Sequence, residues 1–256
     1  MTPVQVLLLM SMLMSTASFV MGPLGRVVHQ TSRLSSFSRD LEAKEIEKLV
    51  QDDSISAVVE RLATLQPGDN ISEQDFQFVA TKAIMALGAH GAYEKTKDIM
   101  ELLEQCTSRG PDVRAFTAAM TVQIRANQFE EAWDTFEAMQ ERAHLQLDEV
   151  AYVCGARAAG FVLPWEAVMD LAVDALVDVG GEAALSVAHT AMTNLKYLAV
   201  NSREERQEVL EQVWEMFHWL QTEKLTITTQ TTDIVLSVAS THGDALEVEK
   251  VLVEMG

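Results

Sequence analysis

One spacing pattern recurs along most of the chain and constrains its fold more than any other feature. Ala132, Phe136 and Met139 are separated by four and then three positions, which places their side chains on one face of a helix. Similar triplets begin at Thr96, Ala167, Val213 and Val248. The steps from one triplet to the next are 36, 35, 46 and 35 residues. A period near 35 residues predicts helical units that stack on one another rather than one compact globule.

The segment from Asp112 to Asp148 indicates what one such unit contains. Residues 113–126 carry apolar side chains at every fourth position, and residues 129–142 carry a broader apolar stripe. Each of these two segments is therefore predicted to be a helix with one apolar face. Asn127 lies between them, and Asn tolerates the left-handed conformation that ends a helix. Because neither helix can bury its apolar face alone, the pair requires neighbours.

Comparable helix pairs are expected in most of the remaining chain. Ser72 and Ser202 are each followed three residues later by an acidic residue, which is typical of a capped helix start. With only five prolines and no sustained alternation of apolar and polar residues, the chain is predicted to be all-α. The other expected helices span 72–89, 92–105, 150–159, 165–177, 182–200, 202–222, 231–240 and 245–255.

The first 39 residues differ in composition from the rest. Residues 6–14 form a short apolar run, and small residues follow at 15–18, as in a signal peptide. Residues 22–39 are Ser-rich, contain arginine and lack acids, as in an organelle transit peptide. The combination resembles the two-part leaders of algae with complex plastids. It predicts a targeting leader at 1–39 that is removed or disordered, with a plastid favoured over a mitochondrion.

Two other locations remain open, secretion and attachment to a membrane. The apolar run is short for a membrane span, so no stable span is expected after leader cleavage. Residues 40–70 are interpreted as a degenerate half-repeat, and residues 71–256 as about five repeats, of which the last is interrupted at Gly256. Cys106 and Cys154 stand alone in the sequence and are expected to be small buried residues in a reducing compartment.

The sequence contains no pattern typical of catalysis. It lacks an HExxH motif, a phosphate-binding glycine loop and a GxSxG motif, and its six histidines are scattered. The acids from Glu204 to Glu215 are interpreted as a solvated helix face, and the four tryptophans as packing residues. We therefore expect a protein without enzymatic activity, metal or cofactor.

The net charge of −19 argues at first against a nucleic-acid partner, yet the charges are unevenly distributed. The first helix of each expected pair carries most of the basic side chains that could face a ligand. In these segments five basic residues stand against two acidic ones. The basic residues are Lys82, Arg114, Arg125, Arg157 and Lys196, and the acidic residues are Glu149 and Asp233.

The central unit resembles the pentatricopeptide repeat. The run F-E-E-A-W-D-T-F-E-A-M from Phe129 to Met139 is similar to the second helix of that repeat, and Phe116-Thr117 is similar to the opening of its first helix. Asp148 stands where such repeats often end. The resemblance covers residues 77–256, with looser matches outside the central unit. The tetratricopeptide repeat is the alternative, and its pattern fits less well.

The resemblance implies a right-handed α-solenoid whose first helices line an inner groove that binds single-stranded RNA, about one base per repeat. The residues that would read bases are Thr81 with Asp112 and Thr117 with Asp148, and in this family such a pair favours guanine. In the third repeat the corresponding position is Val153 or Tyr152, and neither suits this role. Contacts to the RNA backbone are expected from Lys82, Arg114, Arg125 and Arg157.

The sequence thus predicts a non-catalytic RNA-binding protein that acts in organelle RNA processing, stability or translation. The alternative is an acidic helical-repeat scaffold that binds other proteins in its groove, in the manner of tetratricopeptide proteins. The acidity of the chain and the poor base readers outside the first two repeats motivate this alternative.

Overall fold

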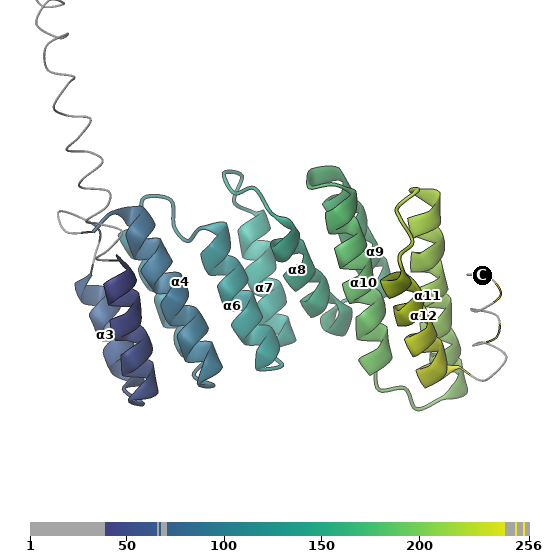
Figure 1. Cartoon of the computed structure of the whole chain (residues 1–256), viewed down its shortest axis with the longest axis horizontal. Helices are drawn as coiled ribbons and strands as arrows, with labels where there is room; N and C mark the ends of the chain where they lie inside the picture. The colour runs from purple at the N-terminus through teal and green to yellow at the C-terminus, as the bar shows by residue number, and fades with distance from the viewer. Residues whose placement is uncertain (1–38, 66, 68–70, 244–248, 250–252, 254–256) are drawn as a thin grey trace, which may run out of the picture. The chain divides into compact units, whose positions relative to one another are not determined.

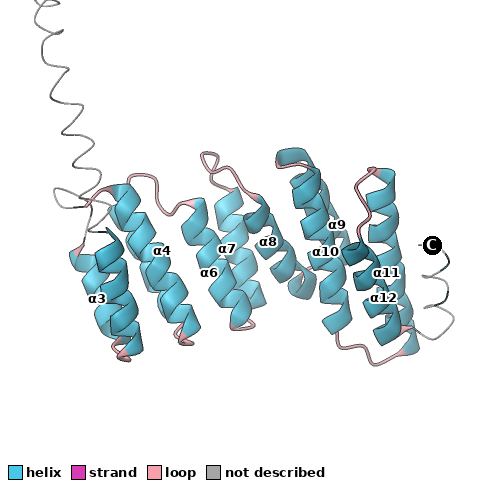
Figure 2. Cartoon of the chain, viewed as in Figure 1, coloured by secondary structure: helices cyan, strands magenta, loops and turns pink. Residues whose placement is uncertain are grey.

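The structure, a computed structural model, describes residues 39–65, 67, 71–243, 249 and 253. Over these residues it contains helices joined by turns and no strand, which confirms the all-α prediction (Figure 2). The leader predicted at 1–39 lies outside the described residues except for its last position. The helix predicted at 245–255 lies almost entirely outside them. The chain divides into two compact units, Met1–Ala83 and Ile84–Gly256.

The described part of the first unit consists of a helix at 39–51, α3 (Ile55–Thr64) and the first part of α4 (Glu73–Ala89). Ile46 and Leu62 are buried in its core. Arg61 forms an ion pair with Glu42 at 2.8 Å, which joins α3 to the preceding helix. The predicted cap of α4 is present, because the Asp75 amide donates to Ser72 Oγ at 3.1 Å.

The second unit contains the end of α4 and eight further helices within the described residues (Figure 1). Their bounds agree with the predicted helix pairs to within a few residues, because capping and apolar periodicity are local signals. The helices are α5 (Lys95–Cys106), α6 (Val113–Arg125), α7 (Phe129–Gln140), α8 (Glu149–Val162), α9 (Trp165–Asp178), α10 (Gly181–Tyr197), α11 (Arg203–Thr222) and α12 (Thr229–His242).

Alternate helices of the second unit form two sets, which we call the first helices (α6, α8, α10 and α12) and the second helices (α5, α7, α9 and α11). Each first helix contacts the next first helix, and the second helices pack against the first helices beside them. One cluster of buried apolar side chains extends from Phe116 in α6 to Ala239 in α12. The apolar faces are therefore covered by neighbouring helices, as the repeated spacing predicts.

The first helices run parallel to one another. Ser186 Oγ donates to Glu149 Oε1 at 2.6 Å, and one to two turns further along, Asn194 Nδ2 donates to the Ala156 carbonyl at 3.0 Å. In both contacts the α10 residue comes 37 or 38 positions after its α8 partner. This nearly constant offset, the register, shows that the two helices are parallel. Thr121 Oγ1 lies 3.8 Å from Cys154 Sγ, which sets the register of α6 against α8 at 33 residues.

The α10–α12 contact has the same sense. His189 Nε2 lies 2.8 Å from Thr231 Oγ1 near the start of α12, and His242 Nε2 lies 3.0 Å from the Leu195 carbonyl near its end. These two buried bonds join a histidine to a polar atom of the neighbouring helix. They satisfy polar groups that the packing of the two helices removes from water.

The turns between helices use the residues that the sequence indicates. Asn127 has a φ of 58° between α6 and α7, as predicted for the end of a helix. Ser202 and Glu205 form a capping box at the start of α11, also as predicted. Pro164 is the N-cap of α9, where the missing amide proton of proline costs the helix no hydrogen bond.

Phe136 of α7 packs against α8 in the core. Its side chain is fully buried, and its ring centroid lies 5.3 Å from that of Trp133 and 5.9 Å from that of Tyr152. Gly155 of α8 lies against this ring, since a Cβ added there would come within 2.7 Å of it. The absence of a side chain at Gly155 therefore lets α7 and α8 approach closely.

Replacing Phe136 with alanine should lower the free energy of unfolding by about 3–5 kcal/mol, because the cavity lies where two helices meet. Urea denaturation followed by circular dichroism measures the change. The neighbouring variant Glu137→Ala, at an exposed position of the same helix, is the control and should change stability by less than about 0.5 kcal/mol. Equal unfolding midpoints for the two variants would contradict this assignment of the buried face.

Candidate nucleic-acid interface

The first helices present a row of mostly polar side chains that lie outside the buried core. These residues are half-buried and follow helical spacing along α6, α8 and α10. They form what we call the first-helix face: Thr117, Thr121, Val153, Arg157, Ser186, Thr190 and Thr193. A shallow hollow of about 370 Å³ on this face is lined by side chains from α8, α10 and α12.

The threonine hydroxyl groups on this face are held by their own helices. Thr117 Oγ1 donates to the Val113 carbonyl at 2.9 Å, and Thr190 Oγ1 donates to the Ser186 carbonyl at 2.8 Å. A hydroxyl that donates its proton in this way keeps its capacity to accept a hydrogen bond. The face can therefore offer acceptors of fixed orientation to the N–H groups of a ligand.

The two aspartates predicted to read bases are also helix caps. Asp112 Oδ1 accepts from the Ala115 amide at 2.9 Å, and Asp148 Oδ1 accepts from the Ala151 amide at 2.9 Å. Each carboxylate is thereby fixed at the start of α6 or α8, with part of its acceptor capacity used by the helix. A substitution that removes the cap would change stability as well as binding.

The structure places the two predicted pairs differently. The register of α6 against α8 puts Asp148 about level with Ala115, within one turn of Thr117, so the second pair lies at one end of the first-helix face. Thr81 belongs to the first unit and Asp112 to the second, so that pair does not form a described site. Thr81 is the ninth residue of α4, whereas Thr117 is the fifth of α6.

The third helix pair has no polar residue at the corresponding position. Tyr152 is buried, and its hydroxyl donates to Asp178 Oδ2 at 2.5 Å. Burial and the neighbouring Asp178 carboxylate raise the pKa of this tyrosine above its ordinary value. Tyr152 therefore has a structural role, and Val153 lines the hollow instead.

Basic side chains gather at the C-terminal ends of the first helices. Because α8 residues lie level with α6 residues 33 positions earlier, Arg125 is at about the same height along the helices as Arg157. The Arg157 guanidinium carbon lies 5.8 Å from the Tyr197 ring centroid, and Lys196 Nζ lies 5.9 Å from the same ring. Tyr197 is 59% exposed. An exposed aromatic ring beside two cations is an arrangement that can stack a base and hold a phosphate.

The other two residues predicted to contact the RNA backbone are Arg114 and Lys82. Arg114 is exposed in the first turn of α6, at the opposite end of the first-helix face from Arg125. Lys82 belongs to the first unit, where its Nζ lies 5.7 Å from the Phe78 ring centroid. Within the second unit, the structure thus brings Arg125 and Arg157 to one end of the face and places Arg114 at the other.

Sequence reasoning missed Tyr197. The ring ends α10, next to Lys196, but its contact with Arg157 spans 40 positions along the chain and depends on the register between two helices. Trp214 is buried, as expected for a packing residue. Trp165 is half-buried and lines a separate groove.

His189 and the two cysteines do not form a reactive site. Burial lowers the pKa of His189, which favours the neutral ring that bonds Thr231. Cys106 and Cys154 are free and half-buried, and burial raises the pKa of the Cys154 thiol. Among the residues that the structure describes, no group of His, Cys, Asp or Glu could hold a metal ion.

The comparisons with known proteins add no family to this description. No protein-family model matches the chain, and no curated protein matches its sequence. A search of the described helices finds none with the length and apolar character needed to cross a membrane. The fold and face define the class only as an all-α protein built from paired helices.

Proposed function

We propose that the chain is a non-catalytic, single-stranded RNA-binding protein of the pentatricopeptide type. The main support is the first-helix face, on which parallel helices carry fixed hydroxyl acceptors and a cluster of Arg125, Arg157 and Lys196. The hydroxyls would meet the edges of unstacked bases, and the cations would meet phosphates. Its role would be in the processing, stability or translation of organelle RNA, in a plastid rather than a mitochondrion.

The finer fold proposed with this function is a right-handed α-solenoid with the first helices on the inner side. Two observations support it. The first helices of the second unit contact their successors, whereas the second helices contact their successors little or not at all. In a curved stack of two layers the inner layer is the more closely spaced, so this difference favours first helices along the concave surface.

The strong acidity of the chain is compatible with this binding surface. The second helices carry many acids, whereas the first-helix face carries mainly hydroxyl side chains and Arg157, with Glu149 as an acid lining its hollow. Because charge interactions in water decay over roughly 10 Å at 0.1 M salt, acids on the second helices are largely screened from a ligand on the opposite face. Few cations are present, so the affinity should be modest and depend weakly on salt.

Thr117 and Asp148 are proposed to favour guanine. A hydroxyl and a carboxylate both accept hydrogen bonds, and the Watson–Crick edge of guanine presents N–H donors, so the two sets match. A carboxylate would instead repel the acceptor atoms of a pyrimidine edge.

The double variant Thr117→Val, Asp148→Asn tests this preference while keeping the helix cap, because Asn also caps helices well. We expect the preference for guanine-rich over adenine-rich RNA to fall by about fivefold or more, since two hydrogen bonds are lost or weakened. Fluorescence anisotropy with labelled single-stranded RNA at low salt measures the affinities.

The matched control is Thr135→Val, Asp134→Asn on the second helix α7, where Thr135 Oγ1 also donates to the carbonyl four residues earlier. This variant should bind like the parent. An unchanged guanine preference in the first variant would contradict the assigned base readers. If the parent binds no RNA but retains a protein partner after RNase treatment, the scaffold function is correct instead.

The variant Arg125→Gln, Arg157→Gln tests the proposed phosphate contacts. Each lost phosphate contact should reduce the slope of log affinity against log salt by about 0.7 for a single strand. The variant should therefore bind all sequences more weakly, with a shallower slope. Titrations at several salt concentrations give this slope directly.

Lys97→Gln, Arg109→Gln removes the same charge from exposed positions outside the first-helix face and serves as the control. Its affinity should fall only slightly, and its slope should match that of the parent. Equal losses in the two variants would mean that net charge, rather than the cluster at the ends of the first helices, governs binding.

The scaffold alternative is favoured by one specific observation, the net charge of −19. A strongly acidic surface attracts basic protein segments as readily as it repels nucleic acid. This function would use the same helix pairs and would not need Thr117 or Asp148.

A further inference from the structure

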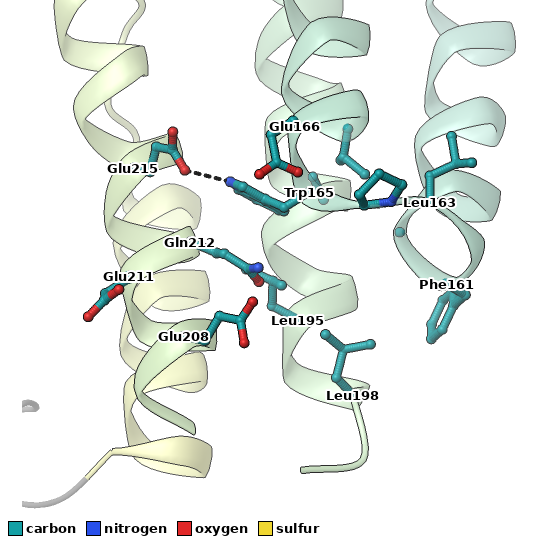
Figure 3. Close-up of a pocket in the computed structure, with 14 residues that line it drawn as sticks. Phe161, Leu163, Trp165, Glu166, Leu195, Leu198, Glu208, Glu211, Gln212 and Glu215 are labelled. Atoms are coloured by element: carbon teal, nitrogen blue, oxygen red, sulfur yellow. Dashed lines mark hydrogen bonds between the residues drawn. The ribbon is translucent and has the colours of Figure 1, made fainter. Parts of the chain in front are cut away.

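A groove lies between the second helices α9 and α11 and is lined by none of the residues of the first-helix face (Figure 3). Helix α10 contacts both of these helices and forms the base of the groove. The groove has a volume of about 650 Å³, which is within the usual range for sites that bind ligands. It is large enough for several side chains and much larger than a single ion.

The base of the groove is apolar and one wall is acidic. Leu195 and Leu198 of α10 and Val168 of α9 contribute apolar surface. Figure 3 shows Glu208 and Gln212 of α11 directed toward these α10 leucines. The carboxylates that line the groove are Glu166, Glu208, Glu211 and Glu215. No lysine or arginine is among the described residues that line it.

These carboxylates lack a cation. None of the four forms an ion pair with another described residue, although the structure contains ion pairs elsewhere, such as that of Arg61 with Glu42. Glu211 points away from the groove, so Glu208 and Glu215 of α11 and Glu166 of α9 are the relevant acids (Figure 3). An apolar base with unpaired carboxylates beside it is complementary to a ligand that is both cationic and apolar.

Trp165 makes the site more specific. Its indole Nε1 donates to Glu215 Oε2 at 2.8 Å, which joins the start of α9 to α11 across the groove. The bond fixes the plane of a half-buried ring that lines the same space as Glu208 and Leu195 (Figure 3). The face of a tryptophan attracts cations, and guanidinium groups stack on it more readily than ammonium groups.

The alternatives for the occupant fit less well. A metal ion is disfavoured because no suitable group of ligands exists among the described residues. RNA would place phosphates against the carboxylates of Glu208 and Glu215. A polyamine would satisfy the charges but would leave the apolar base uncovered. A planar cation flanked by apolar side chains matches the carboxylates, the apolar base and the Trp165 ring of the groove.

We propose that this groove binds an arginine-containing peptide segment of a partner protein. The guanidinium stacks on Trp165 and bonds Glu215, Glu208 adds negative charge about two turns away on α11, and a neighbouring apolar side chain covers Leu195 and Leu198. The site shares no residue with the first-helix face, and its Phe161 ring lies 5.9 Å from the Arg157 guanidinium carbon of that face. The protein would then join an RNA to a second protein through two different surfaces.

An array of immobilised hexapeptide pools tests the proposal, with one central position fixed as Arg, Lys, Leu or Glu and the others randomised. The full chain should be retained most by the arginine pools. Glu208→Gln, Glu215→Gln should reduce this retention about tenfold or more, because charge-assisted hydrogen bonds are lost. The glutamine at 215 can still accept from Trp165, so the fold is preserved.

The matched control is Glu130→Gln, Glu137→Gln, which removes two exposed charges seven residues apart on α7, as in the groove variant. It should retain the arginine preference. Equal retention by all pools, or equal losses in the two variants, would overturn the proposal. Equal retention by arginine and lysine pools would contradict stacking on Trp165, and full displacement by spermidine would indicate a polyamine site instead.

Discussion

The second unit depends on the burial of one apolar face per helix against the neighbouring helices. No helix in it can cover its own face, and the buried side chains join into one cluster from α6 to α12. Burial of apolar surface stabilises the folded state by about 25 cal/mol per Å². Each contact between neighbouring helices buries several apolar side chains and therefore contributes to the free energy of unfolding. Loss of one contact should therefore weaken both adjoining pairs.

Close approach of the first helices follows from the small residues on their contact surfaces. Buried alanines occur along both α8 and α10, and Gly160 of α8 lies directly against Asn194 of α10. Because large side chains are absent there, the two backbones approach and Asn194 reaches the Ala156 carbonyl. The same approach brings polar residues of successive helices into one continuous face, on which the proposed function depends.

Much of the helical organisation could be predicted from the sequence. The start of α11 follows from Ser202 and Glu205, and the turn after α6 follows from Asn127, because these signals act within a few residues. The buried positions of Ala132, Phe136 and Met139 follow from spacing alone. Similar local signals place the helices throughout the described second unit.

The candidate sites could be predicted only in part. Arg157 was expected to contact a ligand, but its neighbour Tyr197 depends on a register that no local signal contains. The groove depends on Trp165 meeting Glu215, 50 positions later in the chain. The acids of α11 were expected to form a solvated face, and they are exposed, yet Glu208 and Glu215 also line this groove. Contacts between distant segments are the features that a sequence pattern leaves undetermined.

The register of the first helices is most directly tested by a disulfide between α6 and α8. Thr121 Oγ1 and Cys154 Sγ are 3.8 Å apart, so a Thr121→Cys variant should form an intramolecular bond to Cys154 under mild oxidation. Peptide mapping by mass spectrometry identifies the linked residues. We expect this bond in Thr121→Cys and not in Thr117→Cys, one turn away. A bond from position 117, or none from position 121, would contradict the register from which the first-helix face is built.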